Sequence, residues 1–418
     1  MNHDVAIVGA GPVGLCLARA LAVQGLAVAL VERQPQAALA DPAFDGREIA
    51  LTHASVRLLR ELDVWQRIPE DEAYPLRTAR VMDRELPHEL HVRPQAGDRL
   101  GDLVANHLIR RAAWQAVRET AGIDLHASAT VASIHAGADG ARLQLADGTR
   151  LQARLLVAAD SRYSETRRAL GIGAELHDFG RAMLVCRIRH ELPHGHAAWE
   201  WFGLGQTLAL LPLSEQLAGA VVTLPGEQAR ALAAMDEAAF AADLQRRYGG
   251  RLGRIELASS RHVYPLVATW AHRFAGTRLA LAGDAAVGMH PVTAHGFNLG
   301  LASVERLSDV AASALRQRRD LGDEALLARY ERRHRHGCWP LFQATGAIVG
   351  LYTDDRLPAR WLRSATLRAS AALPPFRRAL ADVLTDDGAR DAPPLQRVRS
   401  RLARMRGPRD TGAEPVAH

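Results

Sequence analysis

The stretch from Val5 to Glu32 constrains the fold of this chain more than any other part of its sequence. Val5–Val8 is an apolar run of strand length, and the glycine turn Gly9-Ala10-Gly11-Pro12-Val13-Gly14 follows it directly. Residues 15–24 read as a helix without a breaker, and residues 27–31 form a second apolar run that ends at Glu32. The order strand, glycine turn, helix, strand and acid predicts a Rossmann-like unit that binds a dinucleotide.

Each part of this unit has a physical task in holding a dinucleotide. Gly9 permits a tight turn, Gly11 lets the backbone approach a pyrophosphate, and Gly14 lets the helix lie close to the sheet. The helix N-terminus offers unpaired N–H groups and partial positive charge to the phosphates. Glu32 follows Gly14 by eighteen positions and is placed to accept hydrogen bonds from a ribose.

Length and composition are those of an ordinary globular protein. The 418 residues are 48% hydrophobic and 23% charged, which allows two domains or one large domain with an insertion. No run of about 18 apolar residues occurs, so we expect no transmembrane helix. The first strand starts at Val5 and leaves no room for a signal peptide, which predicts a cytoplasmic protein with at most peripheral contact at the inner membrane.

The charged residues and cysteines exclude several classes of chemistry. Lysine is absent, which removes any mechanism that needs a catalytic lysine. The basic excess of +6 is not interleaved with aromatic residues, so we expect no nucleic-acid binding. The three cysteines lie far apart, and no histidine or cysteine cluster has zinc spacing, which predicts free thiols and no metal.

The rest of the chain predicts a second, mainly antiparallel layer inserted into the dinucleotide-binding fold. Alternating runs dominate residues 178–265, with a helical insertion at 226–248. Within the first fold, the pattern predicts a helix over 103–121 and a strand over 125–134. The predicted parts are a discontinuous dinucleotide-binding domain (1–75, 101–177 and 266–345), a substrate-binding sheet domain (76–100 and 178–265) and a helical C-terminal region with a basic tail (346–418). The tail is either a solvated end or a contact for acidic lipid or a partner protein.

Two further motifs carry chemistry. Asp160-Ser161-Arg162-Tyr163-Ser164-Glu165-Thr166-Arg167 follows a predicted strand, and Gly283-Asp284 stands at the end of another. An acid at a strand end, followed by a helix N-terminus, suits a ribityl or ribose hydroxyl and a nearby phosphate. The loop over 291–298 would present backbone N–H groups to the pyrimidine edge of a flavin, where they stabilise negative charge.

With these three motifs in order, the chain resembles the FAD-dependent aromatic hydroxylases of the p-hydroxybenzoate hydroxylase type. The resemblance covers roughly residues 5–350, and no second glycine fingerprint for NAD(P)H occurs. Within that group it is most similar to the ubiquinone-biosynthesis hydroxylases (the UbiH, UbiF and UbiM set), through Gly46-Arg47-Glu48-Ile49-Ala50-Leu51, the Asn106 segment and the residues from His290 to Gly300. The run Pro291-Val292-Thr293-Ala294-His295-Gly296-Phe297-Asn298 resembles the UbiM type in particular.

The resemblance implies the site residues. Those expected to bind FAD are Gly9, Gly11, Pro12, Gly14, Glu32, Arg33, Arg47, Asp160, Arg167, Gly283, Asp284, Pro291, Gly296, Phe297 and Asn298. His295 is the candidate base for a phenol and shares the catalytic loop with Pro291; the alternative is a histidine that only fixes the loop. An apolar substrate pocket is expected from Trp199, Trp201, Phe202, Leu210 and Tyr264, with ordinary core packing as the alternative.

The sequence departs from the family pattern at three places. Ser161 stands where the family usually has Gly, and Ala294-His295 stand where it commonly has Gly-Gln. His107 follows Asn106 where an Arg is frequent, which removes one expected contact to the flavin phosphates.

The implied reaction is hydroxylation of a polyprenylated ubiquinone precursor, for example demethoxyubiquinol. NAD(P)H would serve as a transient electron donor to FAD, oxygen would add at the flavin C4a as a hydroperoxide, and one oxygen atom would pass to the ring. Other ubiquinone-biosynthesis proteins are the expected partners. The alternatives are the same chemistry on a pigment or polyketide precursor, a non-catalytic flavoprotein subunit, and a flavin-linked reductase of prenyl double bonds.

Overall fold

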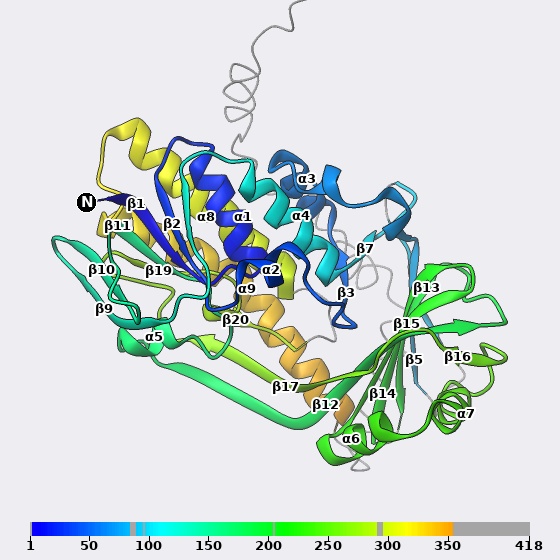
Figure 1. Ribbon diagram of the computed structural model, residues 1–418. Coiled ribbons are helices and arrows are strands. Elements are labelled where there is room, and N and C mark those ends of the chain that lie inside the picture. The colour runs from blue at the N-terminus through cyan, green and yellow to red at the C-terminus, as the bar shows by residue number, and fades with distance from the viewer. Residues whose placement is uncertain (1, 84–88, 95–96, 204, 291–295, 354–418) are drawn as a thin grey trace, which may run out of the picture.

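The computed structural model describes residues 2–83, 89–94, 97–203, 205–290 and 296–353. Among these residues the chain forms three sheets, two of them large (Figure 1). The first large sheet is the nucleotide-binding sheet, in the order β18-β19-β11-β1-β2-β8, with β10 and β9 added beside β11. Its strands are β1 (His3–Val8), β2 (Val28–Val31), β8 (Ile123–His126), β9 (Val131–Gly137), β10 (Gly140–Leu145), β11 (Arg150–Ala158), β18 (Ala275–Gly276) and β19 (Leu279–Leu281).

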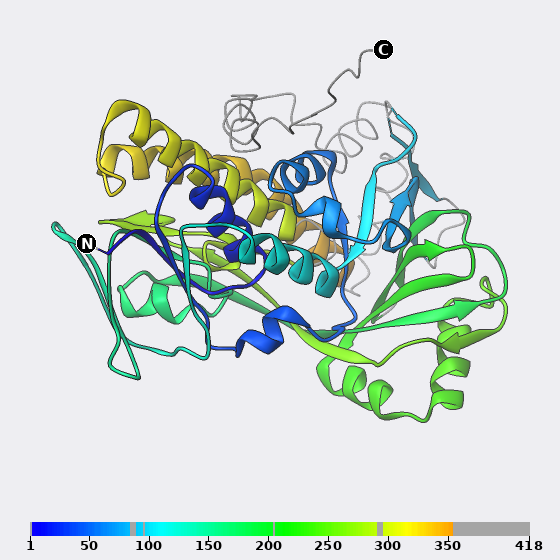
Figure 2. The same ribbon diagram turned by 45° about the horizontal axis from the view of Figure 1, so that its top comes forward.

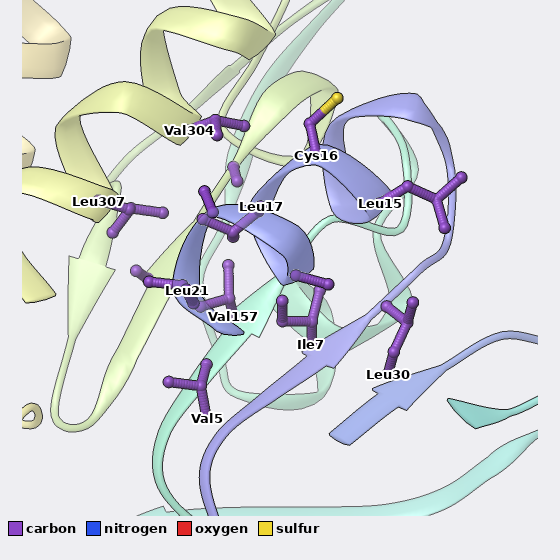
Figure 3. Close-up of a cluster of buried hydrophobic side chains, with 14 of the residues drawn as sticks. Val5, Ile7, Leu15, Cys16, Leu17, Leu21, Leu30, Val157, Val304 and Leu307 are labelled. Carbon is purple, nitrogen blue, oxygen red and sulfur yellow. The ribbon is translucent and has the colours of Figure 1, made fainter. Parts of the chain in front are cut away.

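The centre of this sheet is parallel and fully buried. β1 pairs in parallel with both β2 and β11, and every residue from Val5 to Val8 is at most 9% exposed. Continuous apolar strands are typical of parallel sheets with both faces covered. Figure 3 shows Ile7, Leu17, Leu21 and Val304 in the packed layer between the sheet and its helices.

Helices cover this sheet and pack against one another. α1 packs against both α4 and α8, and α8 packs against α9. Figure 2 shows α8 and α9 running alongside the sheet toward the other end of the molecule. The helices of this part are α1 (Pro12–Ala22), α2 (Gln36–Ala40), α3 (His53–Glu61), α4 (Asn106–Arg118), α5 (Glu165–Ala169), α8 (Gly296–Gln317) and α9 (Glu324–Thr353), with short 3-10 turns η1 (Trp65–Arg67), η2 (Glu70–Glu72) and η3 (Gly283–Ala285).

The second large sheet is mainly antiparallel, in the order β20-β17-β12-β15-β14-β13-β5-β6, with β16 beside β12. Helices α6 (Gly226–Ala234) and α7 (Glu237–Arg247) cover one of its faces, which confirms the predicted helical insertion (Figure 1). We call this face the helix-covered face and the opposite one the domain-facing face. The strands are β5 (Thr78–Asp83), β6 (Leu90–Val92), β12 (Ala174–His190), β13 (Ala197–Gly203), β14 (Gln206–Ser214), β15 (Leu217–Pro225), β16 (Ile255–Leu257), β17 (His262–Ala271) and β20 (Val287–Gly288).

A small third sheet contacts elements of both large parts of the molecule. It consists of β3 (Glu48–Leu51), β7 (Gly101–Ala105) and β4 (Ala73–Leu76), all antiparallel. Leu103 of β7 packs with Leu211 of β14 in one buried cluster, so this sheet meets the domain-facing face.

Two sequence predictions of local structure are wrong. The helix expected from Leu103 begins only at Asn106, because residues 101–105 pair with β3 and β4 as a buried strand. The strand expected over 125–134 is interrupted after His126, where Ser128 has a φ of +54° and turns the chain into β9. Both errors arise because pairing with strands that are distant in the sequence outweighed the preference of the local sequence pattern.

The expected domain boundaries fall inside long strands. β12 and β17 pair from Ala174↔Ala271 to Val185↔His262, with a register shift between Asp178 and Ala182. Both strands therefore run from the edge of the nucleotide-binding part into the second sheet. The division into two domains remains a prediction, and these two strands join its parts.

Candidate active site

In the glycine turn after β1, the fold itself requires glycine at two positions and does not require it at a third. Gly9 has a φ of +104°, and a Cβ there would lie 2.5 Å from the carbonyl oxygen of Ala159. A Cβ on Gly14 would lie 1.9 Å from the carbonyl oxygen of Gly9. In contrast, no heavy atom lies within 4 Å of a Cβ placed on Gly11. The space beside Gly11 is therefore open to a ligand.

The N-terminus of α1 is suited to an anion. Gly11 is the N-cap, Pro12 opens the helix, and no described side chain caps it. The first turn holds no acidic residue that would compete for its partial positive charge. Unpaired N–H groups beside an open space match the requirements of a pyrophosphate.

Glu32 is held against this turn. Its Oε2 accepts a hydrogen bond from the Ala10 amide at 2.7 Å, and its Oε1 accepts one from the Gln34 amide at 2.9 Å. Arg33 beside it is exposed. Arg110 of α4, which the sequence reasoning missed, donates to the Gln34 side chain at 3.2 Å and brings a guanidinium close to Glu32.

Arg47 belongs to a compact polar group with Asp45. Its Nη2 lies 2.6 Å from Asp45 Oδ2, which also accepts from the Asn106 side chain at 2.7 Å. The guanidinium lies over the Tyr264 ring at 5.4 Å, and the Tyr264 hydroxyl donates to the Asp45 carbonyl at 2.8 Å. The Arg47 hydrogen bonds hold the pKa of Asp45 below its usual range despite burial. Asp284 adds a favourable charge at Arg47, so Arg47 and the third motif share one electrostatic environment.

Asp160 closes the strand β11 and organises the turn after it. Its Oδ1 accepts from the Ser164 hydroxyl at 2.5 Å, and its Oδ2 accepts from the Thr166 amide at 2.9 Å. Ser161 has a φ of +79°, in the left-handed region. This conformation explains why a Gly is the usual residue in the related motif.

Two arginines join this turn to the loop after β19. Arg167 is 2% exposed, and it donates to the carbonyl of Ala285 at 2.9 Å and to that of Arg162 at 3.2 Å. Arg162 donates from Nη2 to Asp284 Oδ2 at 3.1 Å and from Nη1 to the Val267 carbonyl at 2.9 Å. Arg162 was absent from the sequence-based list, although it lies inside the second motif.

The start of α8 is packed onto α1. A Cβ on Gly300 would lie 2.5 Å from Val13 Cγ2, so only glycine allows this approach of the two helices. The buried Asn298 side chain donates to the Ala50 carbonyl at 2.8 Å and accepts from the Thr52 amide at 3.2 Å. Asn298 therefore ties α8 to β3. Gly296 has open space beside it, and Phe297 packs on the core.

The predicted catalytic loop residues Pro291 and His295 lie outside the described residues. His290, the last described residue before them, is buried and meets the Phe179 ring edge-on at 4.8 Å. Burial lowers the pKa of His290 to about 4, and the nearby Arg181 charge acts in the same direction.

The structure separates the five residues expected to line a substrate pocket. Trp199, Trp201 and Leu210 lie on the helix-covered face, in one cluster with Phe240 and Leu244 of α7. These three residues pack as the core alternative describes, and their place in a substrate pocket stays a prediction.

Phe202 and Tyr264 belong to the domain-facing face instead. Register connects them through one cross-strand row, Phe202↔Thr207↔Thr223↔Met183↔Tyr264. Tyr264 is the member of the row that contacts the Asp45–Arg47 group.

The comparisons with known proteins agree with this geometry. A family model described as an FAD binding domain matches residues 2–345. The ubiquinone hydroxylase UbiM of Neisseria meningitidis is 43% identical over 391 residues, which cover 92% of this chain and 85% of the relative. The ubiquinone hydroxylase UbiL of Rhodospirillum rubrum is 34% identical over 376 residues, covering 90% and 87%. The chain belongs to this family of FAD-dependent aromatic hydroxylases.

A solved structure supports the fold of the hydroxylase. The p-nitrophenol 4-monooxygenase of Pseudomonas putida superposes with a TM-score of 0.71 at 18% identity, over 91% of this chain and 98% of the other. Together with the family model, this confirms the predicted fold class. The hydroxylase uses FAD, and NAD(P)H is the usual electron donor of its family.

The residues present fit FAD. The open space beside Gly11 and the uncapped N-terminus of α1 suit the pyrophosphate, and Glu32 lies at the same turn. Arg162 holds Asp284, and Arg167 bonds to the Ala285 carbonyl, so the turn that contains Asp160 is joined to the loop that contains Asp284. The arrangement joins the three motifs, although they are far apart in the sequence.

Proposed function

We propose that this hydroxylase acts on the aromatic ring of a polyprenylated ubiquinone precursor, with demethoxyubiquinol as one example. The observation that carries the proposal is the 43% identity to a ubiquinone hydroxylase over 92% of the chain. The 3-demethoxyubiquinol 3-hydroxylase of Escherichia coli is also similar, at 28% identity over 88% of this chain.

The roles of individual residues belong to this proposal. The glycine turn and Glu32 bind the adenosine and pyrophosphate half of FAD, and the loops after β11 and β19 bind the rest. The proposed FAD residues are Gly9, Gly11, Pro12, Gly14, Glu32, Arg33, Arg47, Asp160, Arg167, Gly283, Asp284, Pro291, Gly296, Phe297 and Asn298. Reduced FAD supplies the oxygen-activating chemistry when it is bound.

The protein's own contribution is to orient FAD and the ring substrate and to enclose them. Arg167 and Arg162 fix the two acid-bearing loops relative to each other through bonds to backbone carbonyls and to Asp284. The domain-facing face supplies apolar and weakly polar side chains for a ring substrate. His295 is the proposed proton acceptor for a phenol, and a His295→Gln variant that hydroxylates at the wild-type rate would remove that role.

Complementation tests the proposal. Strains that each lack one ring hydroxylase of ubiquinone biosynthesis would receive this gene, and their quinones would be identified by mass spectrometry. We expect one or more strains to regain ubiquinone, and the identity of the strain reveals the ring position. Expression of an FAD-loaded protein that restores none of them would contradict the proposal.

We also propose peripheral contact with the membrane that holds the polyprenylated substrate. No helix among the described residues is long and apolar enough to cross a membrane. Sedimentation with anionic liposomes, with and without residues 389–418, tests the contact and the part of the basic tail in it. Absence of binding in both forms would contradict it.

A further inference from the structure

One face of the helix α9 is exposed and changes character along the helix. Arg332 and Trp339 are exposed and lie seven residues apart, which is two helical turns. The exposed residues Gln343 and Ala347 continue the same face at intervals of four residues. No charged residue occurs over residues 337–353. The face is therefore basic at Arg332 and uncharged beyond it.

Trp339 is the large side chain of this face and is 47% exposed. Its ring meets the buried Trp270 ring of β17 edge-on at 5.1 Å, and Phe342 packs on Trp270 at 4.9 Å. These contacts fix the position of the Trp339 ring while much of it stays exposed. Exposed apolar residues that stand alone are ordinary, whereas those within a continuous uncharged face are typical of interaction surfaces.

Basic residues surround the start of this face. Arg335 donates to the His272 carbonyl at 2.9 Å, which brings the exposed Arg273 beside it, and Arg332 lies one turn earlier on α9. Glu331 supplies one negative charge to the group, 3.9 Å from Arg335. Three guanidinium groups and one carboxylate leave a net positive charge. We call the following residues the α9 surface: Arg273, Arg332, Arg335, Trp339, Gln343 and Ala347.

The α9 surface is close to the candidate flavin site. Trp270, which supports Trp339, pairs with Val287 of the neighbouring strand β20. A Cβ on Gly288, the next residue, would lie 3.6 Å from Asp284 Cγ. Trp270 therefore lies between the α9 surface and the strand that contacts the acid-bearing loop after β19.

The charges of the α9 surface favour an anionic phospholipid bilayer over other occupants. Arginines near a membrane attract anionic headgroups, and tryptophan prefers the boundary between headgroups and acyl chains. A helix with a basic part and an uncharged face suits a position in the plane of that boundary. A second copy of this chain would bring the same three guanidinium groups, and the chain's own tail over residues 389–418 is also basic, so like charges would oppose both.

We propose that the α9 surface docks this protein on an anionic phospholipid bilayer. Trp339 enters the headgroup boundary, and the guanidinium groups beside it pair with lipid phosphates. The inference deepens the proposed function and rests on it for the purpose of docking, since the bilayer is where a polyprenylated substrate dissolves.

Cosedimentation with vesicles tests the inference. The full-length FAD-loaded protein is mixed with vesicles of phosphatidylcholine, either alone or with phosphatidylglycerol added. We expect the wild type to bind the anionic vesicles at least about tenfold more tightly than the neutral ones. Arg332→Glu should weaken that binding by about tenfold and Trp339→Ala by about fivefold. Leu192→Ala is the matched control and should bind as the wild type does, because Leu192 is also 47% exposed but follows β12.

Two results overturn the inference. One is equal vesicle binding by the wild type, Arg332→Glu and Trp339→Ala, whatever the effect of removing the basic tail. The other is a dimer on gel filtration that both variants abolish, without vesicle binding, which assigns the surface to a second copy. Bound FAD reports the folding of each variant, and if Trp339→Ala loses it, the substitution at the exposed Arg332 decides alone.

Hydroxylation of a detergent-solubilised short-chain precursor separates the inference from the proposed function. Both variants should hydroxylate it at the wild-type rate. If the wild type hydroxylates no precursor while the variants still lose vesicle binding, the proposed function fails and the docking stands.

Discussion

Arg162 and Asp284 form an ion pair, with Nη2 and Oδ2 3.1 Å apart, that joins two motifs separated by more than a hundred residues. Arg162 follows the strand β11 and Asp284 follows the strand β19, which are parallel neighbours in the nucleotide-binding sheet. The carboxyl ends of adjacent parallel strands meet at one edge, where ligands of such sheets bind. The pair therefore fixes the orientation of Asp284 at the place where the flavin is proposed to bind.

Removing this pair should weaken FAD binding more than it weakens the fold. For Arg162→Leu we expect an FAD dissociation constant raised by several-fold, because Asp284 loses its positioning partner. The free energy of unfolding should fall by no more than about 1 kcal/mol, since the pair is partly exposed. Flavin fluorescence and chemical denaturation measure the two effects. Arg168→Leu is the control, and equal FAD affinity in both variants would contradict the role of Arg162.

The glycine turn offers a matched pair of substitutions. Gly11→Ala should lower stability by no more than about 1 kcal/mol, the usual difference for alanine at an N-cap, because the space beside it is open. It should nevertheless weaken FAD binding at least about tenfold, by occupying the space proposed for the pyrophosphate. Gly14→Ala should destabilise the fold by about 3 kcal/mol, because its Cβ meets a carbonyl oxygen. Full FAD occupancy in Gly11→Ala would exclude a pyrophosphate at this position.

Replacing Ser161 with glycine should stabilise the folded protein. Its φ of +79° is unfavourable for any residue with a Cβ. We expect Ser161→Gly to raise the free energy of unfolding by about 0.5–1 kcal/mol, after the greater flexibility of glycine in the unfolded chain is subtracted. Ser133→Gly, within the strand β9, should lower stability instead. Denaturant titrations that rank the two variants the other way would contradict this account.

The buried Glu48–Arg187 pair should behave as a coupled unit. Arg187→Met leaves the Glu48 carboxyl, 1% exposed, without its cation and should cost about 3–5 kcal/mol of stability. The double variant Glu48→Leu/Arg187→Met should regain most of that loss, because no uncompensated charge is left. A double-mutant cycle measures the coupling, and purely additive losses would show that the two side chains do not stabilise the fold through each other.

The parts of the fold that the sequence predicts best are those with local causes. Residues 5–32 form their strand, helix and strand as expected because a breaker-free helix and two apolar runs are bounded by glycines. The sequence did not predict the strand at Leu103–Ala105, because that strand conformation depends on pairing with residues 48–51 and 73–76. Nothing local in the sequence distinguishes such a run from the start of a helix.

The sequence predicted those parts of the site that lie within its motifs. The acid-bearing turns at Asp160 and Asp284 follow strands whose parallel order could be inferred, and the structure brings them together. The face of the second sheet that meets the nucleotide-binding part could not be predicted, because alternation on β13 separates Trp199 from Glu200 without showing which side is covered by helices. Only the packing of α6 and α7 decides that, and it places Glu200 on the other side.

One measurement tests the central claim that this protein is an FAD-dependent hydroxylase of a ubiquinone precursor ring. The purified FAD-loaded enzyme would be incubated with NAD(P)H, a short-chain prenylated precursor and ¹⁸O₂, and the product analysed by mass spectrometry. We predict a product that carries a single ¹⁸O atom on the aromatic ring. Oxidation of NAD(P)H that yields only hydrogen peroxide, with every precursor recovered unlabelled, would contradict the claim.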